Sequence, residues 1–288
     1  MNLEKHIPFF FLIPSLVIIF SLFIYPTLYS LYLCFFDIKA YSFGGFVGLR
    51  NFQNLIFSFS FLNSLYVTFN FVFLSLIIEF FLGLGLAILL NRVHKGANLL
   101  RAIFTLPFMV TPVIVGLIFR LIYSPEYGIL NELFAFLGLE GQLWLINPKT
   151  AILALVAVDV WEWTPFVTLI LLAGIKSIPP TYYEVASIYG ASRIKQFTHV
   201  TLPLLKPHML IAIIFNLMRA FKTFDIVVML TKGGPGESTN LISYYIQQVA
   251  ISYMKLSQGA AATQILLLII LIIANLYIAY LKKWIKIT

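Results

Sequence analysis

The sequence predicts an all-α polytopic membrane protein with six transmembrane helices. Hydrophobic residues make up 61% of the 288 residues, charged residues only 10%, and the mean hydropathy is +0.96, which lies outside the range of soluble domains. Six apolar segments are each long enough to cross a hydrocarbon core of about 30 Å, which takes about 20 helical residues. None alternates as a β-barrel strand does, so we expect helices, which also satisfy their own backbone hydrogen bonds in lipid. The six segments are residues 7–36, 61–90, 102–123, 150–175, 209–230 and 260–281.

The first apolar segment follows Lys5 and is longer than the hydrophobic region of a signal peptide. It also lacks a small-residue cleavage site, so we expect it to be retained as an anchor. No low-complexity linker interrupts the chain, and we therefore expect one transmembrane domain over residues 1–288, with its core over 61–282. The single cysteine, Cys34, lies in an apolar run, so neither a disulfide nor a thiolate metal site is expected.

The basic residues predict the orientation, because cytoplasmic loops of membrane proteins are enriched in Lys and Arg. With both termini placed in the cytoplasm, eleven Lys and Arg fall on the cytoplasmic side and five on the outside. We therefore expect a multi-pass protein of the cell (inner) membrane with cytoplasmic N- and C-termini. The net charge of +8 then reflects this topology and contact with anionic lipid, so it does not require a nucleic-acid partner. The eleven cytoplasmic residues are Lys5, Arg92, Lys95, Arg101, Lys176, Arg193, Lys195, Lys206, Lys282, Lys283 and Lys286.

A polar loop of residues 176–207 separates the fourth apolar segment from the fifth and is predicted to lie in the cytoplasm. Pro179 and Pro180 cannot continue the preceding helix, but they suit the start of another. Thr181-x-x-Glu184 has the pattern of a capping box, in which each side chain bonds a backbone N–H near the helix start. A short helix is therefore expected to begin at this point.

Gly190 predicts the end of that helix, since glycine takes the backbone angles that close a helix and permit a turn. Ala186 lies four residues earlier, and the two make a small face that lets another surface approach closely. We expect a second short helix over about 193–200 that stops at Pro203. One interpretation is a cytoplasmic helix-turn-helix that docks a partner, and the other is a capped interfacial hairpin in which Glu184 serves only the cap.

The loop reads E-V-A-S-I-Y-G-A-S from Glu184 and V-T-L-P from Val200. This pattern resembles the coupling-loop signature of permease subunits in binding-protein-dependent ABC importers, which is Glu-Ala-Ala, three residues, Gly, and later Ile/Val-x-Leu-Pro. Val185 and Tyr189 depart from it, because Ala and an acidic residue are common at those positions. The resemblance implies that the loop contacts an ATPase through Glu184, Ala186, Gly190, Leu202 and Pro203.

The resemblance covers most of residues 45–282 and is most specific at 224–236, which looks like the end of the fifth span in the first of two paired sugar permeases of the maltose- or glycerol-phosphate-transporter kind. It implies the ABC type I importer permease fold and the import of a sugar or a related polyol or oligosaccharide. The implied partners are a second homologous permease in a heterodimer, two ATP-binding subunits and an extracellular solute-binding protein. This chain has no Walker A sequence and no catalytic motif, so we do not expect an enzyme, and we expect ATP and Mg to be bound by the partner ATPase. Further matching segments are 48–52, 106–112 and 125–131.

Polar side chains within the fourth and fifth apolar segments indicate a substrate path, because polar groups are costly in lipid and tend to face cavities. Asn216, Arg219 and Thr223 are spaced three and four apart and form one polar stripe. An alternative interpretation is an ion pair between Glu162 and Arg219 that locks the two helices, with the tryptophans as an interfacial belt. Alignment with the maltose-type permease implies a substrate pathway of Glu162, Trp163, Phe166, Asn216, Arg219 and Thr223.

A different class of function is a self-contained secondary carrier or channel, with Asp159, Glu162 and Asp225 as proton or cation sites. Such a protein would have no use for the coupling loop, and no inverted repeat is evident among the six segments. An intramembrane enzyme is weaker still, because no nucleophile–base pair or metal cluster is visible. Glu79, and the pair Lys222 and Asp225, are interpreted mainly as packing or intersubunit pairs.

Overall fold

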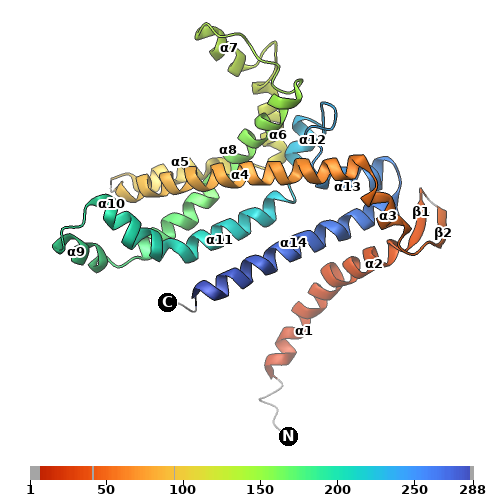
Figure 1. Cartoon of the computed structure of the whole chain (residues 1–288), viewed down its shortest axis with the longest axis horizontal. Coiled ribbons are helices and arrows are strands. Elements are labelled where there is room, and N and C mark those ends of the chain that lie inside the picture. Colours follow the sequence, from red (N-terminus) through yellow and green to blue (C-terminus); the bar gives the residue numbers. More distant parts are fainter. Residues whose placement is uncertain (1–6, 41, 94, 286–288) are drawn as a thin grey trace. The chain divides into compact units, whose positions relative to one another are not determined.

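Figure 1 shows the computed structural model, which describes residues 7–40, 42–93 and 95–285. Lys5 and Lys286, which the predicted orientation uses, lie outside the described residues. The contacts within the chain form two compact units, and each is described by itself. The first comprises Met1–Leu62 and Tyr245–Ile269, and the second comprises Asn63–Tyr244 and Ile270–Thr288.

The first unit contains the first predicted span. Its elements are α1 (Ile7–Ile19), the π-helical turn η2 (Phe20–Ile24), α2 (Tyr25–Leu33), β1 (Phe36–Lys39), β2 (Ser42–Phe46), α3 (Arg50–Ile56), the π-helical turn η4 (Gln248–Ser252) and the first parts of α4 (Phe59–Arg92) and α14 (Leu256–Ile285). From α1 to α2 the chain is one continuous helix, and Leu12–Leu33 is long and apolar enough to cross a membrane. An antiparallel hairpin of β1 and β2 follows, in which Phe36 pairs with Phe46.

Asn51 fastens this hairpin to the end of the first span. Its side-chain Nδ2 donates to the carbonyl oxygens of Cys34 and Phe36, both at 2.8 Å, and the residue is only 4% exposed. One buried side chain thereby bonds the backbone at the end of the span and at the start of the hairpin. The asparagine of the segment 48–52 therefore has a structural role, which is to join the hairpin to the end of the first span.

The second unit is built around three long helices that pack together. Its elements are the rest of α4, α5 (Ala97–Met109), α6 (Pro112–Ile122), α7 (Ile129–Phe136), α8 (Pro148–Ser177), α9 (Thr181–Ile188), α10 (Arg193–Gln196), the π-helical turn η3 (Phe197–Thr201), α11 (Leu202–Ala220), α12 (Asp225–Leu230), the start of α13 (Ile242–Gln247) and the rest of α14. Buried side chains of α4, α8 and α11, among them Ala87, Leu171 and Leu205, form one apolar cluster. Gly174 lets α11 come close to α8, because a Cβ there would lie 2.5 Å from the His208 ring.

Two predicted spans are not single straight helices. The third, predicted over 102–123, consists of α5 and α6 bent by 90°, since Pro112 holds the residue before it, Thr111, in extended backbone. In the fifth, predicted over 209–230, the helix ends at Ala220, and the chain turns before α12 begins. The described residues thus contain five helices that are long and apolar enough to span a membrane, or six if the bent pair counts as one span.

The helix of the fifth span begins earlier than predicted. We expected the second loop helix to stop at Pro203, and that stop is wrong: α10, η3 and α11 follow one another without a break from Arg193 to Ala220. Pro203 lies in the first turn of α11, directly after the π-helical turn η3. The i→i+5 hydrogen-bond pattern of that turn accommodates the proline ring and its lack of an N–H. The loop is therefore joined rigidly to the span that follows it.

Candidate functional site

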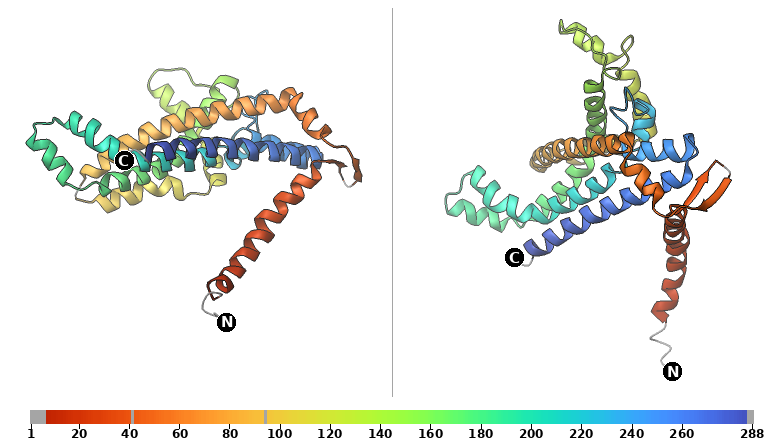
Figure 2. Two further views of the ribbon diagram at one scale, coloured as in Figure 1. Left: turned by 60° about the horizontal axis from the view of Figure 1, so that its bottom comes forward. Right: turned by 45° about the vertical axis from the view of Figure 1, so that its right-hand side comes forward.

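The loop between α8 and α11 folds as the predicted helix-turn-helix, and its two short helices project from the second unit (Figures 1 and 2). Gly190 closes α9 with a φ of +72°. Its N–H donates to the Ser187 carbonyl, and the N–H of Ala191 donates to the Ala186 carbonyl, both at 2.9 Å. These two bonds form a Schellman-type helix end. The predicted role of Gly190 in ending the helix is confirmed.

The predicted capping box is wrong. Pro180 occupies the cap position with helical backbone angles, so Thr181 is already the first residue of α9. The N–H of Glu184 donates to the Pro180 carbonyl at 3.1 Å instead of to the Thr181 hydroxyl. Glu184 is exposed, and within the described part of the chain its carboxylate forms no hydrogen bond or ion pair. It is therefore free to contact another molecule.

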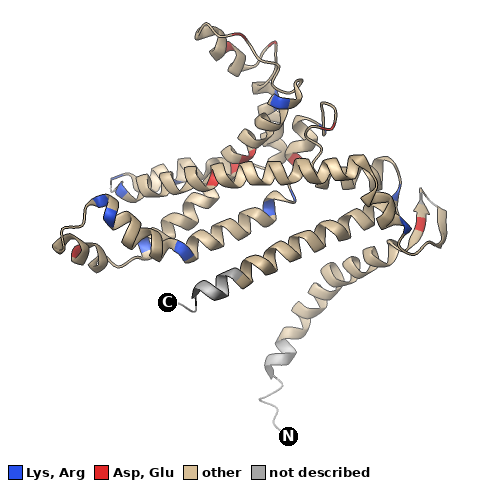
Figure 3. Cartoon of the chain, viewed as in Figure 1, with Lys and Arg blue, Asp and Glu red and all other residues tan. Residues whose placement is uncertain are grey.

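The same loop carries an exposed apolar surface, here called the docking face. Ile188 and Tyr189 are 84% and 85% exposed, and Ile194 is 76% exposed. A hydrogen bond of 2.9 Å from Gln196 Nε2 to Ser187 Oγ links the two short helices, so the surface is held in shape. Basic side chains gather around this end of the second unit (Figure 3). An ordered, outward-facing apolar surface of this kind is typical of a protein interface. The docking face comprises Tyr182, Val185, Ile188, Tyr189 and Ile194.

Arg219 is the centre of a buried polar cluster where α4, α8 and α11 meet. Its Nη1 and Nη2 donate to the two carboxylate oxygens of Asp159 at 2.6 and 2.9 Å, and Nη2 also donates to Glu79 Oε1 at 3.3 Å. Both carboxylate side chains are fully buried, and the arginine side chain is 15% exposed. Partners of this kind offset the cost of burying an ionised carboxylate, whose loss of hydration costs several kcal/mol per ion.

Asn216 and Trp163 complete the surroundings of the guanidinium. Asn216 Oδ1 accepts from Arg219 Nε at 2.8 Å, while its Nδ2 donates to Glu79 Oε2. The ring of Trp163 lies over the guanidinium, with 4.3 Å from Cζ to the ring centre, as a cation–π contact requires. We call Glu79, Asp159, Asn216 and Arg219 the Arg219 cluster.

The alternative ion pair between Glu162 and Arg219 is wrong. Arg219 pairs with Asp159, which lies one turn before Glu162 on α8, and with Glu79 on α4. Glu162 is 1% exposed, and its Oε2 has no hydrogen-bond partner among the described residues. Sequence spacing shows that these carboxylates share one side of the helix, but the choice between them depends on how α8 and α11 are rotated against each other.

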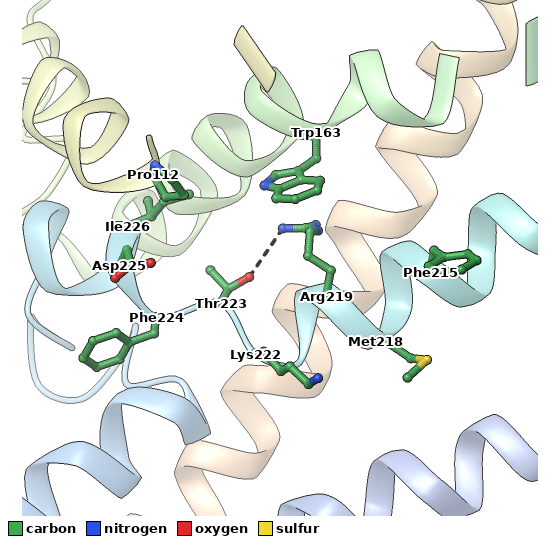
Figure 4. Close-up of a pocket in the computed structure, with 10 residues that line it drawn as sticks. All are labelled: Pro112, Trp163, Phe215, Met218, Arg219, Lys222, Thr223, Phe224, Asp225 and Ile226. Atoms are coloured by element: carbon green, nitrogen blue, oxygen red, sulfur yellow. Dashed lines mark hydrogen bonds between the residues drawn. The ribbon is translucent and has the colours of Figure 1, made fainter. Parts of the chain in front are cut away.

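A cavity of about 470 Å³ opens beside the Arg219 cluster, between α8, α11 and α12 (Figure 4). Of the six residues predicted for the substrate pathway, the structure places three in its wall, namely Trp163, Arg219 and Thr223. Thr223 Oγ1 accepts from Arg219 Nη1 at 3.5 Å, the contact drawn in Figure 4. The cavity is lined by Pro112, Trp163, Phe215, Met218, Arg219, Lys222, Thr223, Phe224, Asp225 and Ile226.

The other three predicted pathway residues lie outside this wall. Asn216 and Glu162 are each 1% exposed, so both are part of the packed interior behind it. Phe166 stacks on Phe108 with ring centres 5.5 Å apart, and Phe108 meets the Trp163 ring edge-on at 5.2 Å. Phe166 therefore supports the tryptophan that faces the cavity.

Sequence reasoning gave too little weight to Lys222 and Asp225, which it treated mainly as a pair spaced three residues apart on one helix. The helix ends at Ala220, so the two residues lie in a turn and at the start of α12, and both are exposed in the cavity wall. Neither forms an ion pair in the described part of the chain. The signal that could have found them is the change from apolar to polar residues at Lys222, which marks the end of the helix.

Comparison with known proteins places the chain in a family. Residues 79–287, well over half of the chain, match the family described as binding-protein-dependent transport system inner membrane component. The chain belongs to this family. The predicted family and the predicted fold, a helical polytopic protein of the ABC type I importer permease kind, are both confirmed. As an inner membrane component with several apolar helices, the protein is embedded in the membrane.

Relatives of this family match over nearly the whole chain. The trehalose/maltose transport system permease protein MalF of Thermococcus litoralis is 36% identical over 280 residues, which is 97% of this chain and 94% of the relative. The sulfoquinovosyl glycerol transport system permease protein SmoG of Agrobacterium fabrum is 32% identical over 276 residues, 94% of this chain and 89% of the relative. A chain of a bacterial ABC transporter involved in the import of the acidic polysaccharide alginate has the same fold, with a TM-score of 0.86, 23% identity and coverage of 98% and 97%.

Proposed function

We propose that this family member is the permease subunit of an ATP-driven ABC importer that moves a sugar or a related polyol or oligosaccharide across the membrane. One observation carries the proposal: a single unbroken helix joins the loop to the cavity. Ile194 of the docking face lies in its first turn, and Phe215, Met218 and Arg219 of the cavity wall lie near its other end. That helix runs from Arg193 to Ala220, so its two ends are about 40 Å apart at 1.5 Å per residue. A displacement of the loop in the cytoplasm would therefore reach the residues that line the cavity.

The chemistry of the cavity suits a sugar. Trp163, Phe215 and Phe224 offer aromatic surfaces to the CH faces of a pyranose ring, and Lys222 and Asp225 offer a donor and an acceptor for its hydroxyl groups. The substrate pathway is proposed to run past Trp163, Arg219 and Thr223, with Glu162, Phe166 and Asn216 shaping the wall from behind. The names of two relatives, with trehalose and maltose in one and sulfoquinovosyl glycerol in the other, support the sugar class.

The proposed partners follow from what the chain lacks and from its exposed loop. A second homologous permease would complete a heterodimer, and an extracellular solute-binding protein would deliver the substrate. Two ATP-binding subunits would bind ATP and Mg and contact the docking face together with Glu184, Ala186, Gly190, Leu202 and Pro203. The chain itself is proposed to be no enzyme, and both of its termini are proposed to lie in the cytoplasm, on the same side as the loops rich in Lys and Arg.

Reconstitution of the chain with these partners in lipid vesicles tests the proposal. We expect accumulation of sugar against its gradient when ATP is supplied to the ATPase side, and none with a nonhydrolysable ATP analogue. Sustained accumulation driven by a proton or sodium gradient without ATP would instead identify a secondary carrier that uses the intramembrane carboxylates.

A further inference from the structure

We propose that the cavity beside Arg219 selects uncharged saccharides and rejects acidic ones, because its arginine is already fully occupied by the protein. This inference rests on the proposed function for the identity of the cargo as a saccharide. The claim that the cavity does not attract anions is independent of the cargo, because it rests on the charges and hydrogen bonds of the chain alone.

The hydrogen bonds of Arg219 leave it without a free donor. A guanidinium has five N–H groups. Nε–H donates to Asn216, the two N–H groups of Nη1 are matched by Asp159 Oδ1 and Thr223 Oγ1, and those of Nη2 by Asp159 Oδ2 and Glu79 Oε1. An arginine commonly binds a carboxylate or sulfonate through two parallel N–H groups. In this protein Asp159 already occupies those two N–H groups of Arg219, so they are not available to a ligand.

The geometry also closes off one face of the guanidinium. Trp163 covers it at 4.3 Å, so the aromatic ring lies between the charge and that side of the cavity (Figure 4). An acidic ligand would have to break a short buried ion pair before Arg219 could bind it. Removing one partner of such a pair leaves the other charge buried and unpaired, which is strongly unfavourable.

The charge of the whole region points in the same direction. Arg219 and Lys222 are the two cations, while four carboxylates lie in or directly behind the wall. Glu162 directly precedes Trp163 on α8 and is buried behind the wall, whereas Asp225 is exposed in the wall itself. Three of the four carboxylates would have to be protonated before the region carried net positive charge. An anionic sugar therefore meets a neutral or negative cavity, whereas the hydroxyl groups of an uncharged sugar meet Lys222, Asp225 and aromatic surfaces. The four carboxylates are Glu79, Asp159, Glu162 and Asp225.

A cysteine probe measures this potential without any knowledge of the substrate. Met218 lines the cavity, and Met218→Cys introduces a thiol there. The purified transporter in detergent is treated with cationic, neutral and anionic methanethiosulfonate reagents of similar size, and each rate is divided by the rate with free 2-mercaptoethanol. The parent chain is the blank, because its only cysteine, Cys34, is fully buried.

We expect the normalised rate of the cationic reagent to exceed that of the anionic reagent about tenfold or more, as charge-lined clefts steer ions by this much. Asp225→Asn in the Met218→Cys background removes an exposed carboxylate that forms no ion pair with any residue the structure describes, so the fold is retained and the ratio should fall towards one. An equal or faster anionic reagent in the Met218→Cys chain would overturn the proposal. Failure of the neutral reagent to react would also overturn it, since the cavity would then be closed to solutes.

Identification of the bound solute tests the cargo itself. The solute retained by the partner binding protein is released and analysed by mass spectrometry, and we expect a saccharide without carboxylate or sulfonate groups. An acidic saccharide would overturn the inference while leaving the proposed sugar permease intact. A solute that is no saccharide would overturn the proposed function, and the reagent rates would still report the charge of the cavity.

Discussion

Arg219 and Asp159 form a bidentate ion pair, 2.6 and 2.9 Å long, that joins α11 to α8 in the interior of the second unit. Arg219 lies in the wall of the cavity and Asp159 is buried behind it, so the pair fixes the positions of neighbouring wall residues while its own donors are taken up by the protein. The same guanidinium reaches Glu79 on α4, which makes Arg219 the common anchor of three helices.

Asp159→Asn should destabilise the protein by on the order of 3 kcal/mol, because it weakens a buried pair while the arginine stays. Glu79→Gln should cost less, since Glu79 makes only one contact of 3.3 Å with Arg219. Glu162→Gln is the matched control, because Glu162 is equally buried and lacks this pair. Thermal unfolding of the purified transporter measures all three, and an equal loss in Glu162→Gln would contradict the assignment of the ion pair.

Asn216→Leu should lower stability by about 1–3 kcal/mol, since it leaves a donor of Arg219 and an acceptor of Glu79 unsatisfied in a buried place. Asn275→Leu is the control, because Asn275 is exposed and, within the described ranges, its amide bonds only to the carbonyl of Leu271 on its own helix. Denaturation of both variants should separate them clearly, and similar midpoints would mean that Asn216 has no structural role.

The membrane class, the loop and the shared face of Asn216 and Arg219 on α11 could be predicted from the sequence, because each depends on local composition or on helical spacing. Thr223, the third residue of the predicted stripe, lies in the turn beyond the end of α11. Sequence reasoning identified Arg219 as important, yet it chose Glu162 as the partner over Asp159, one turn away on the same helix. The pattern of apolar residues does not predict how α8 and α11 are rotated relative to each other. That rotation determines which carboxylate lies within hydrogen-bonding distance of the arginine.

Breaks in helices were the other source of error. The bend before Pro112 and the end of α11 at Ala220 lie inside continuous apolar segments. The hydropathy of the sequence therefore does not show where these helices break. As a result, Lys222 and Asp225 seemed to share a helix, whereas the turn between them brings both to the cavity. Proline at the start of the loop was informative, but Pro203 was misleading because a π-helical turn accommodates it.

Lys222→Met and Asp225→Asn should each reduce uptake about tenfold or more while leaving the unfolding temperature unchanged. Both side chains are exposed in the cavity and form no ion pair in the described part of the chain, so their loss strands no buried charge. A charged hydrogen bond to a substrate hydroxyl is worth about 1.5–3 kcal/mol, which corresponds to this range. Lys149→Met, an exposed lysine at the start of α8, is the control for loss of surface charge. Uptake at the parental rate in both cavity variants would place the substrate path elsewhere.

Gly190→Trp should abolish uptake while the protein still inserts into the membrane. The left-handed backbone at Gly190 costs a non-glycine residue about 1–2 kcal/mol, and a bulky side chain would project into the open space where a partner is proposed to dock. Gly190→Asn separates the two effects, since asparagine tolerates this backbone and adds little bulk. We expect the Asn variant to keep most of its uptake and the Trp variant to lose co-purifying ATPase.

Ile188→Glu adds an independent probe, because Ile188 is 84% exposed and its substitution changes the docking face without straining the turn. Normal uptake and normal ATPase co-purification in both Gly190→Trp and Ile188→Glu would mean that the loop is only a surface hairpin, and the coupling of ATP hydrolysis to transport would then have to pass through another part of the chain.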